Sequence, residues 1–263
     1  NMTNSHCSML RPKNNKTKPR IKHRPFLKWA GGKFRLTDDL NRVFPKRKQC
    51  LIEPFVGAGA VFLNSYFERY ILADINPDLI NLFNIVKENV DTYIEACKPI
   101  FFAENANTAE YYYAQRDAFN QSTDPFVRSV LFLYLNRFGF NGLCRYNSKN
   151  EFNVPFGAYK THYFPEDELR YFAHKAQSAV FLCADFQQTF ELADKHSVIY
   201  CDPPYAPLPQ DTNFTGYAGN SFGLEHQKNL AECAKKAQKE KQISVVISNH
   251  DTKFTREIYK GAK

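Results

Sequence analysis

The sequence predicts an α/β fold with a parallel sheet, in which one long helical segment interrupts the alternation of strands and helices. Short runs rich in β-branched and aromatic residues alternate with helical patterns before residue 77 and again after residue 165. Glycines directly follow the first of these runs, as in the tight turns of βαβ units. From about residue 90 to residue 163 the alternation stops, which indicates an insertion.

The predicted strand Ser197–Cys201 ends abruptly at Asp202-Pro203-Pro204-Tyr205. Two successive prolines force an extended and rigid turn. A carboxylate, fixed carbonyls and an aromatic ring therefore meet at the carboxyl end of a strand, where open α/β sheets bind ligands. Asp202 and the Pro203 carbonyl suit the two N–H groups of a planar amine, and Tyr205 suits stacking on its ring. A proline turn without a function is the alternative.

Residues 50–61 form a second candidate ligand site, in which a short apolar strand leads to Gly57 and Gly59. These glycines allow a tight turn and close approach of a ligand to the backbone. The next strand, Arg69–Asp74, ends in a carboxylate that is placed to hold ribose hydroxyls. The third glycine of a dinucleotide motif is missing, because position 62 is Phe62. The pattern favours a nucleoside ligand without phosphate, such as S-adenosylmethionine.

Composition narrows the possible partners of this 263-residue chain. A formal net charge of +8 with 15% aromatic residues favours a polyanion, most simply nucleic acid. No apolar run is long enough for a bilayer, so no membrane partner is expected. Seven scattered cysteines without a C-x-x-C pair indicate a reducing cytoplasm and neither disulfides nor a metal site. Residues 1–25 hold seven Lys or Arg and no acid, which predicts a disordered basic tail.

The first ordered segment, residues 26–33, contains two adjacent glycines, the cation Lys33 and the only tryptophan, Trp29. The glycines allow a ligand to approach closely, and Trp29 offers a flat apolar face. A tight turn with a buried tryptophan is the alternative interpretation.

The inserted segment contains Asn141-Gly142, which is a strong signal for a hairpin turn. Cationic and apolar side chains surround this dipeptide, namely Arg137, Phe140, Leu143, Arg145 and Lys149. On a protruding hairpin, arginine reads guanine edges and an aromatic wedge fills a gap in the base stack. An ordinary surface hairpin fits these residues equally well.

After Pro165 the sequence predicts a helix over residues 166–177, a strand over 179–183 followed by Asp185, a helix over 224–239 and a strand over 243–248. Residues 207–222 are rich in Gly, Pro, Asn and Thr, which is typical of an active-site loop.

Four segments together resemble the DNA adenine-N6 methyltransferases of the Dam type. They are Phe-Leu-Lys-Trp-Ala-Gly-Gly-Lys at 26–33, Glu-Pro-Phe-Val-Gly-Ala-Gly at 53–59, Asn-Arg-Phe-Gly-Phe-Asn-Gly-Leu-Cys-Arg-Tyr-Asn at 136–147 and Asp-Pro-Pro-Tyr at 202–205. The resemblance implies a seven-stranded Rossmann-like methyltransferase sheet built from residues 26–76 and 165–263. It also implies an inserted, mainly helical target-recognition domain over 77–164 that bears a β-hairpin.

The resemblance further implies methyl transfer from S-adenosylmethionine to adenine N6 in double-stranded DNA, at GATC and with base flipping. It implies no metal, a monomer, and a cytoplasmic, nucleoid-associated enzyme of bacterial or phage origin. Whether the mark serves mismatch repair and DNA replication or restriction–modification stays open. Methylation of another planar amine, in RNA or in protein glutamine, and a DNA-binding module without turnover are the alternatives. The arginine on the hairpin favours DNA, and intact Asp202, Tyr205 and Asp74 favour turnover.

Residue roles follow from the same resemblance. The cofactor is expected to contact Trp29, Ala30, Gly31, Lys33, Glu53, Phe55, Gly57, Gly59, Asp74, Ile75, Asp185 and Asp202. The catalytic motif is Asp202, Pro203, Pro204 and Tyr205. DNA is expected near Lys28, Phe140, Asn141, Leu143, Arg145, Pro155 and Tyr159. Two features depart from the family, since Phe140 replaces a common Tyr and Lys263 ends the chain before the family's last strands.

Overall fold

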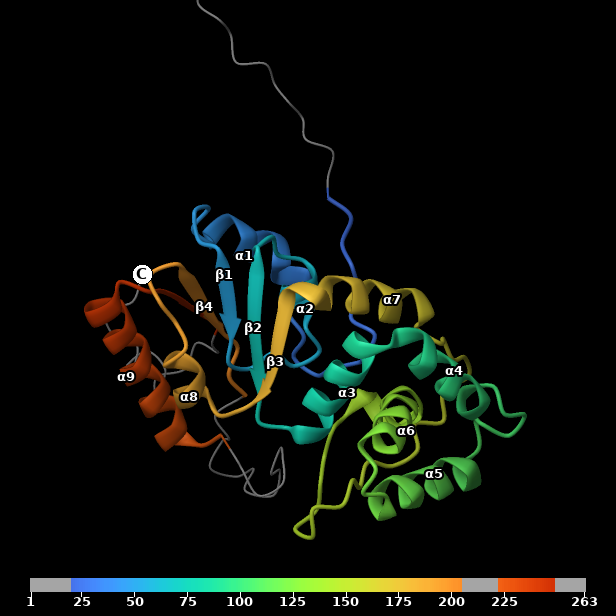
Figure 1. Ribbon diagram of the computed structural model, residues 1–263. Coiled ribbons are helices and arrows are strands. Elements are labelled where there is room, and N and C mark those ends of the chain that lie inside the picture. Colours follow the sequence, from blue (N-terminus) through green and yellow to red (C-terminus); the bar gives the residue numbers. More distant parts are fainter. Residues whose placement is uncertain (1–19, 205–221, 249–263) are drawn as a thin grey trace, which may run out of the picture.

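The computed structural model describes residues 20–204 and 222–248, and it confirms an α/β fold with a parallel sheet (Figure 1). The described residues contain five strands: β1 (Cys50–Glu53), β2 (Arg69–Asp74), β3 (Ala179–Cys183), β4 (Ser197–Cys201) and β5 (Ser244–Ile247). They lie in the order β3-β2-β1-β4-β5, and each neighbouring pair is parallel. The carboxyl ends of all five strands therefore lie along the same edge of the sheet.

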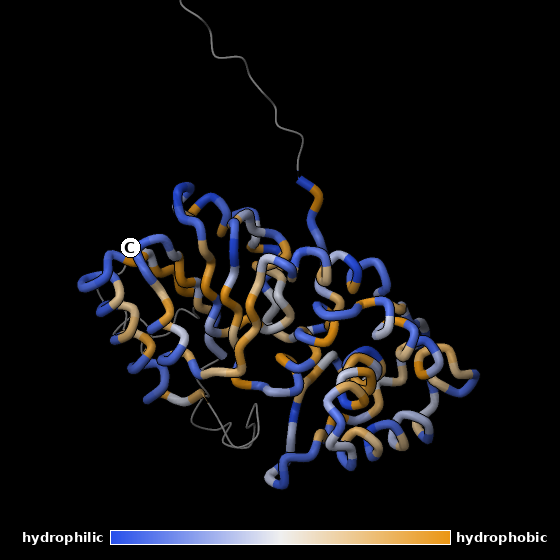
Figure 2. The backbone as a smooth tube through the Cα atoms, in the orientation of Figure 1, coloured by the Kyte–Doolittle hydropathy of each residue, from blue (hydrophilic) through white to orange (hydrophobic). Residues whose placement is uncertain are grey.

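Helices cover both faces of this sheet. Because successive residues of a strand point to opposite faces, neighbouring residues contact different helices. Leu51 and Val198 face the helices α3 (Pro77–Glu88) and α7 (Glu166–Lys175). Their neighbours Ile52 and Ile199 face α8 (Phe186–Phe190) and α9 (Leu224–Lys241) instead. Every residue of β1 and β4 is buried, as expected for central parallel strands, and Figure 2 shows hydrophobic residues along the sheet.

The insertion consists of α4 (Val90–Phe101), α5 (Ala109–Gln121) and α6 (Pro125–Phe138), which lie together beside α3 in Figure 1. Helix α6 begins at Asp124-Pro125, where the Asp124 side chain accepts from the backbone N–H of Phe126. It is buried on nearly all sides, since α3, α4 and α5 pack around it. Shorter elements complete the described chain: α1 (Thr37–Val43), α2 (Ala60–Leu63) and the 3-10 turns Phe34–Leu36, Phe140–Gly142 and Ala176–Ser178.

The hairpin turn lies elsewhere than predicted. Antiparallel bridges join Gly139 to Phe156 and Tyr146 to Phe152, and the turn between these limbs is closed where the Asn147 N–H donates to the Glu151 carbonyl at 2.8 Å. The prediction of a turn at Asn141-Gly142 is therefore wrong.

The Asn-Gly signal is nevertheless real, because φ is +55° at Asn141 and +60° at Gly142. A tertiary contact uses this conformation, since a Cβ on Gly142 would lie 2.5 Å from the Cβ of Lys28. The two residues therefore let the chain pass close to the segment around Lys28 and do not connect two strands.

The basic leader was predicted to extend to Pro25, but residues 20–25 are part of the described structure and pack against it. The backbone of His23 exchanges hydrogen bonds of 2.7 and 2.8 Å with the Asn64 side chain, and its ring stacks on Tyr171 at 3.5 Å. The Arg20 guanidinium lies 3.7 Å above the ring of Tyr66. Contacts between cations and aromatic rings therefore help to order residues 20–25, and the polar composition of this segment does not predict them.

The described residues contain no helix that is both long and apolar enough to cross a membrane.

Asn76 caps α3 and connects it to the insertion. Its side-chain oxygen accepts from the N–H groups of Asp78 and Leu79, and its Nδ2 donates to the Tyr146 hydroxyl at 3.5 Å. Tyr146 in turn donates to Asp78, which also pairs with Arg128 of α6 at 3.0 Å. One buried side-chain amide therefore links the start of α3 to the hairpin.

We expect Asn76→Ala to destabilise the protein by roughly 2–3 kcal/mol, because it removes a cap and leaves buried polar groups without partners. Asn89→Ala is the matched control, since exposed Asn89 caps α4 and does little else; its cost is about 1 kcal/mol. Urea unfolding measures both. Equal losses would show that the Tyr146 contact contributes nothing.

Candidate active site

Four acidic residues follow or end neighbouring parallel strands, and the sequence predicts this position for Asp74, Asp185 and Asp202. Glu53 ends β1, Asp74 ends β2, Asp185 comes shortly after β3, and Asp202 comes directly after β4. Because these strands are parallel and adjacent, their carboxyl ends meet at one edge, where α/β proteins bind ligands.

Asp74 is held at this edge by the glycine turn after β1. It is 6% exposed, and its Oδ2 accepts from the Gly57 N–H at 3.3 Å while its Oδ1 accepts from the Asn76 N–H at 3.1 Å. Burial raises the pKa of Asp74 to about 6, and the backbone hydrogen bonds partly offset that rise. The carboxyl group therefore changes charge close to neutral pH.

Glu53 is 2% exposed, and its Oε2 has no hydrogen-bond partner among the described residues. Burial, together with the charge of nearby Asp202, raises the pKa of Glu53 well above its usual value. A buried polar atom without a partner is costly unless a ligand or water satisfies it. This oxygen therefore fits a ligand that brings a polar group to the sheet edge.

The segment 26–33 is fixed against α6 by two residues of that helix. The side-chain oxygen of Asn136 accepts from the Lys28 N–H at 2.8 Å, and its Nδ2 donates to the Lys28 carbonyl at 2.7 Å. Arg137 donates its Nε to the Phe26 carbonyl at 3.0 Å. Asn136 is 3% exposed, so this pairing occurs away from water.

The fixed segment brings Trp29 and Lys33 to the sheet edge. A Cβ on Gly57 would lie 3.0 Å from Trp29 Nε1, so the indole packs directly on the glycine turn. Lys33 Nζ lies 3.2 Å from Asp202 Oδ1 and donates to the Gly31 carbonyl at 2.8 Å. Trp29, Gly57 and Asp74 thus form one connected group, and Lys33 with Asp202 forms another beside Glu53.

The remaining predicted cofactor residues lie around this edge. Phe55 stacks on Phe186 with ring centroids 5.8 Å apart, and Asp185 caps α8 by accepting from the Gln188 N–H at 2.8 Å. Ile75 is 38% exposed directly after Asp74. Ala30 is exposed, and Gly59 has a φ of +86° at the start of α2. Of the catalytic motif, Pro203 and Pro204 follow β4, whereas Tyr205 and most of the 207–222 loop lie outside the described residues.

The predicted DNA residues form a second cluster on the other side of Lys28. Lys28 Nζ lies 4.5 Å from the centre of the Tyr159 ring, and the Tyr159 hydroxyl accepts from the Asn141 N–H at 2.7 Å. The Phe140 N–H donates to the Pro155 carbonyl at 2.8 Å. Phe140 itself is 45% exposed.

Two further DNA candidates lie on the first limb of the hairpin. Arg145 donates its Nε to the Asn153 side chain at 2.8 Å and its Nη2 to the Asn153 carbonyl at 3.2 Å. Leu143 is half-buried against the core. Sequence reasoning missed Asn136 and Asn153, which position Lys28 and Arg145. A polar Asn136 directly after the apolar run 130–135 was the available signal for the first of them.

A parallel sheet with a glycine turn after its first strand, an acid ending the second and Asp-Pro-Pro after the fourth defines the S-adenosylmethionine-dependent methyltransferase class. Residues 29–263 match the D12 class N6 adenine-specific DNA methyltransferase family, and the chain belongs to that family. It is an adenine-specific DNA methyltransferase with S-adenosylmethionine as its methyl donor, which confirms the resemblance drawn from its motifs.

Curated relatives share most of their length with this chain. A DNA adenine methylase of Haemophilus influenzae is 82% identical over 255 residues, which cover 97% of this chain and 89% of that protein. A DNA adenine methylase of Escherichia coli strain K12 is 60% identical over 242 residues, with 92% and 86% covered. One from Vibrio cholerae is 59% identical over 242 residues, with 92% and 87% covered.

We expect Gly57→Ala to displace Trp29, because the new methyl group would press on the indole at a backbone with φ of +53°. Trp29 is the only tryptophan, so intrinsic fluorescence reports its environment directly. Gly31→Ala is the matched control, since φ is +73° there but a Cβ meets nothing within 4 Å. The emission maximum should shift in the first variant and stay unchanged in the second. An unchanged maximum in both would show that Trp29 does not pack on this turn.

Proposed function

We propose that this enzyme methylates the adenine of GATC in double-stranded DNA after flipping it out of the helix, and that Asp202 with the Pro203 carbonyl holds the flipped amine. The observation that carries this proposal is the position of Asp202, which stands at the carboxyl end of β4 within 3.2 Å of Lys33 and beside buried Glu53. A carboxylate at this place, followed by two rigid prolines, offers acceptors in a fixed geometry.

The cofactor would be held by the residues around Asp74 and Trp29. Asp74 suits ribose hydroxyls, Trp29 and Ile75 offer apolar surface, and the unpartnered Glu53 oxygen fits a polar group of the ligand. Lys33 is the cation of this edge and suits a carboxylate. Bound S-adenosylmethionine supplies an electrophilic methyl group on sulfur.

The protein's contribution to the reaction is mainly electrostatic and geometric. Adenine N6 is a poor nucleophile, because its lone pair is delocalised into the ring. Asp202 and the Pro203 carbonyl would accept the two N6 hydrogens and stabilise the positive charge that develops on nitrogen, which is stabilisation aimed at the transition state. Because Pro203 and Pro204 restrict the backbone, the amine is held in one orientation at little further entropic cost. Tyr205 would stack on the flipped ring.

We place DNA recognition on residues 77–164 together with Lys28. Asn141 and Tyr159 would lie beside Lys28 at the duplex, and Arg145 would read a guanine edge. The exposed ring of Phe140 would enter the stack beside the flipped base, a role that requires a flat ring and no hydroxyl. We also propose a monomeric enzyme in the cytoplasm of a bacterium, like the hosts of its relatives.

The proposed specificity is tested by transfer of labelled methyl groups from S-adenosylmethionine to a duplex with one GATC site. Duplexes that differ from it by one base pair are the comparison. We expect incorporation only with GATC, and digestion to nucleosides should place all label in N6-methyladenine. Equal labelling of the altered duplexes would refute GATC specificity without affecting membership of the family.

Asp202→Ala should reduce kcat by about 10²–10³-fold while duplex binding persists, because the carboxylate acts on the amine and not on the backbone. Asp39→Ala, which removes an exposed carboxylate of α1, is the control and should keep full activity. Single-turnover methylation at saturating cofactor separates chemistry from binding. Near-normal turnover by a folded Asp202→Ala enzyme would remove Asp202 from the reaction.

Cofactor affinity should depend on pH through Asp74, whose pKa is raised to about 6. A carboxylate accepts ribose hydroxyls better than a neutral carboxyl, so affinity rises as pH increases through the pKa and then levels off. Between pH 5 and 7 the Kd should fall about tenfold. Calorimetry on Asp74→Asn should give weaker binding with a flat profile over that range. An unchanged profile would assign the titration to another group.

Arg145→Ala should relax sequence preference rather than weaken all binding equally, since a bidentate guanine contact discriminates by about 1–3 kcal/mol. Asn153→Ala should act in the same direction with a smaller effect, because Asn153 orients the guanidinium. Competition between GATC and single-substitution duplexes measures the preference. A uniform loss of affinity would identify Arg145 as a phosphate contact.

A further inference from the structure

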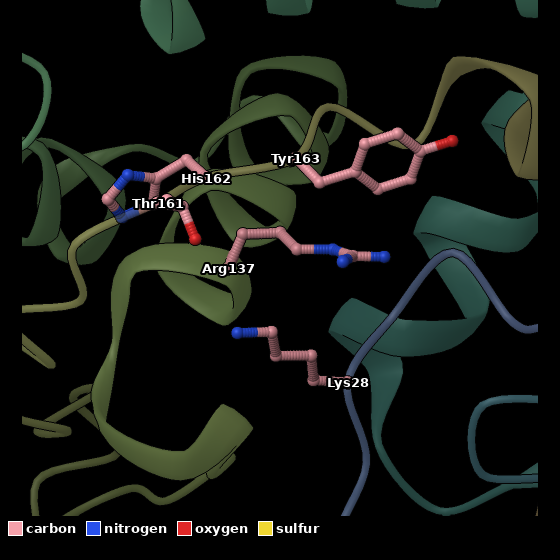
Figure 3. Close-up of a pocket in the computed structure, with 5 residues that line it drawn as sticks. All are labelled: Lys28, Arg137, Thr161, His162 and Tyr163. Carbon is pink, nitrogen blue, oxygen red and sulfur yellow. The ribbon is translucent and has the colours of Figure 1, made fainter.

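A pocket of about 300 Å3 lies beside the DNA cluster, and nothing in the methyl-transfer chemistry uses it. Its lining residues are Lys28, Arg137, Thr161, His162 and Tyr163. Figure 3 shows that they come from three separate parts of the chain: the segment before Trp29, helix α6 and the stretch that leads to α7. Every lining side chain ends in a group able to donate a hydrogen bond.

The pocket holds two cations, Lys28 and Arg137, and the charge of nearby Glu168 acts on Arg137. No carboxylate among residues 20–204 and 222–248 forms an ion pair with Lys28 or Arg137. Glu168 is the acid next to the pocket, and its carboxylate accepts from the Tyr163 hydroxyl at 3.0 Å. Burial and the charge of Arg137 both lower the pKa of Lys28, as expected where two like charges share a site.

His162 adds an unsatisfied nitrogen to the same space. Its ring lies flat on Phe138, with centroids 3.9 Å apart and an interplanar angle of 4°, so its orientation is fixed. The Nε2 atom is buried and has no hydrogen-bond partner in the described part of the chain. A nitrogen left in this state is costly unless a ligand pairs with it.

The Tyr163 proton is already donated to Glu168, but Lys28, Arg137 and Thr161 still offer donors of different shapes, which together select an anion that accepts several hydrogen bonds at once. Phosphate has three or four such oxygens, and arginine forks and lysine point charges are the side chains that bind it most often. We infer that this pocket binds a phosphate group and that, resting on the proposed function, its source is one phosphodiester of the duplex being methylated. The position supports that source, because Lys28 contacts Tyr159, whose hydroxyl binds the Asn141 backbone.

A scan of single neutral methylphosphonates along a GATC duplex tests the inference. For the parent enzyme, the slope of log K against log salt should become less negative by about 0.9 at one linkage, because one counterion fewer is released. Lys28→Met, which keeps the side-chain length and removes the charge, should show the smaller slope with unmodified DNA. A methylphosphonate at that linkage should then cause no further change in the salt dependence of DNA binding by Lys28→Met.

His162→Phe is the second variant, because it keeps a ring on Phe138 and removes the unpartnered nitrogen. It should weaken binding to unmodified DNA and be insensitive to the same methylphosphonate. Arg47→Met removes a cation from the exposed loop before β1 and is the control, so it should respond to each linkage as the parent does.

Inorganic phosphate distinguishes the two sources. Phosphate could raise the melting temperature of the parent, but not that of His162→Phe, above the value in chloride of equal ionic strength. If, in addition, no methylphosphonate distinguishes the variants from the parent, the pocket binds free phosphate and the DNA source is wrong. If neither a linkage nor free phosphate responds to the variants, the inference is overturned. Methylation of unmodified GATC by the parent would still stand, so that failure is distinct from failure of the proposed function.

Discussion

The arrangement of both functional clusters depends on one buried amide, the side chain of Asn136. It pairs with both backbone polar groups of Lys28 and so fixes the path of the chain at one residue. With the backbone fixed at Lys28, the Lys28 side chain reaches Tyr159, and the next residue, Trp29, packs on Gly57. A paired and water-excluded amide specifies position strongly, because any displacement leaves polar groups without partners.

The second constraint is the burial of carboxyl groups at the sheet edge. Parallel strands bring Glu53, Asp74 and Asp202 to one edge, where burial raises the pKa of Glu53 and Asp74 and the charge of Asp202 further raises the pKa of Glu53. The fold offsets this cost unequally. Asp74 receives two backbone N–H groups and Asp202 receives Lys33, whereas one oxygen of Glu53 receives nothing among the described residues. Such inequality is typical of binding sites, in which some polar groups are completed only by a ligand.

The strands and the Asp-Pro-Pro turn could be predicted from the sequence, because a strand's periodicity and proline's missing N–H act locally. The acid at the end of β2 could be predicted for the same reason. The hairpin turn could not, since Asn141-Gly142 uses its positive φ for a close approach of Gly142 to Lys28, 114 residues away along the chain. His23 could not be placed from the sequence either. The polar composition of residues 1–25 predicts a solvated tail, but His23 contacts Asn64 and Tyr171, which are distant in sequence.

Segment 26–33 contributes neighbouring residues to both clusters. Lys28 contacts Tyr159 among the proposed DNA residues, and the adjacent Trp29 contacts Gly57 among the proposed cofactor residues, so one peptide bond links the two groups. Because Asn136 and Arg137 hold that segment from a buried helix, the proposed DNA and cofactor residues are held in a fixed relation to each other before any ligand binds.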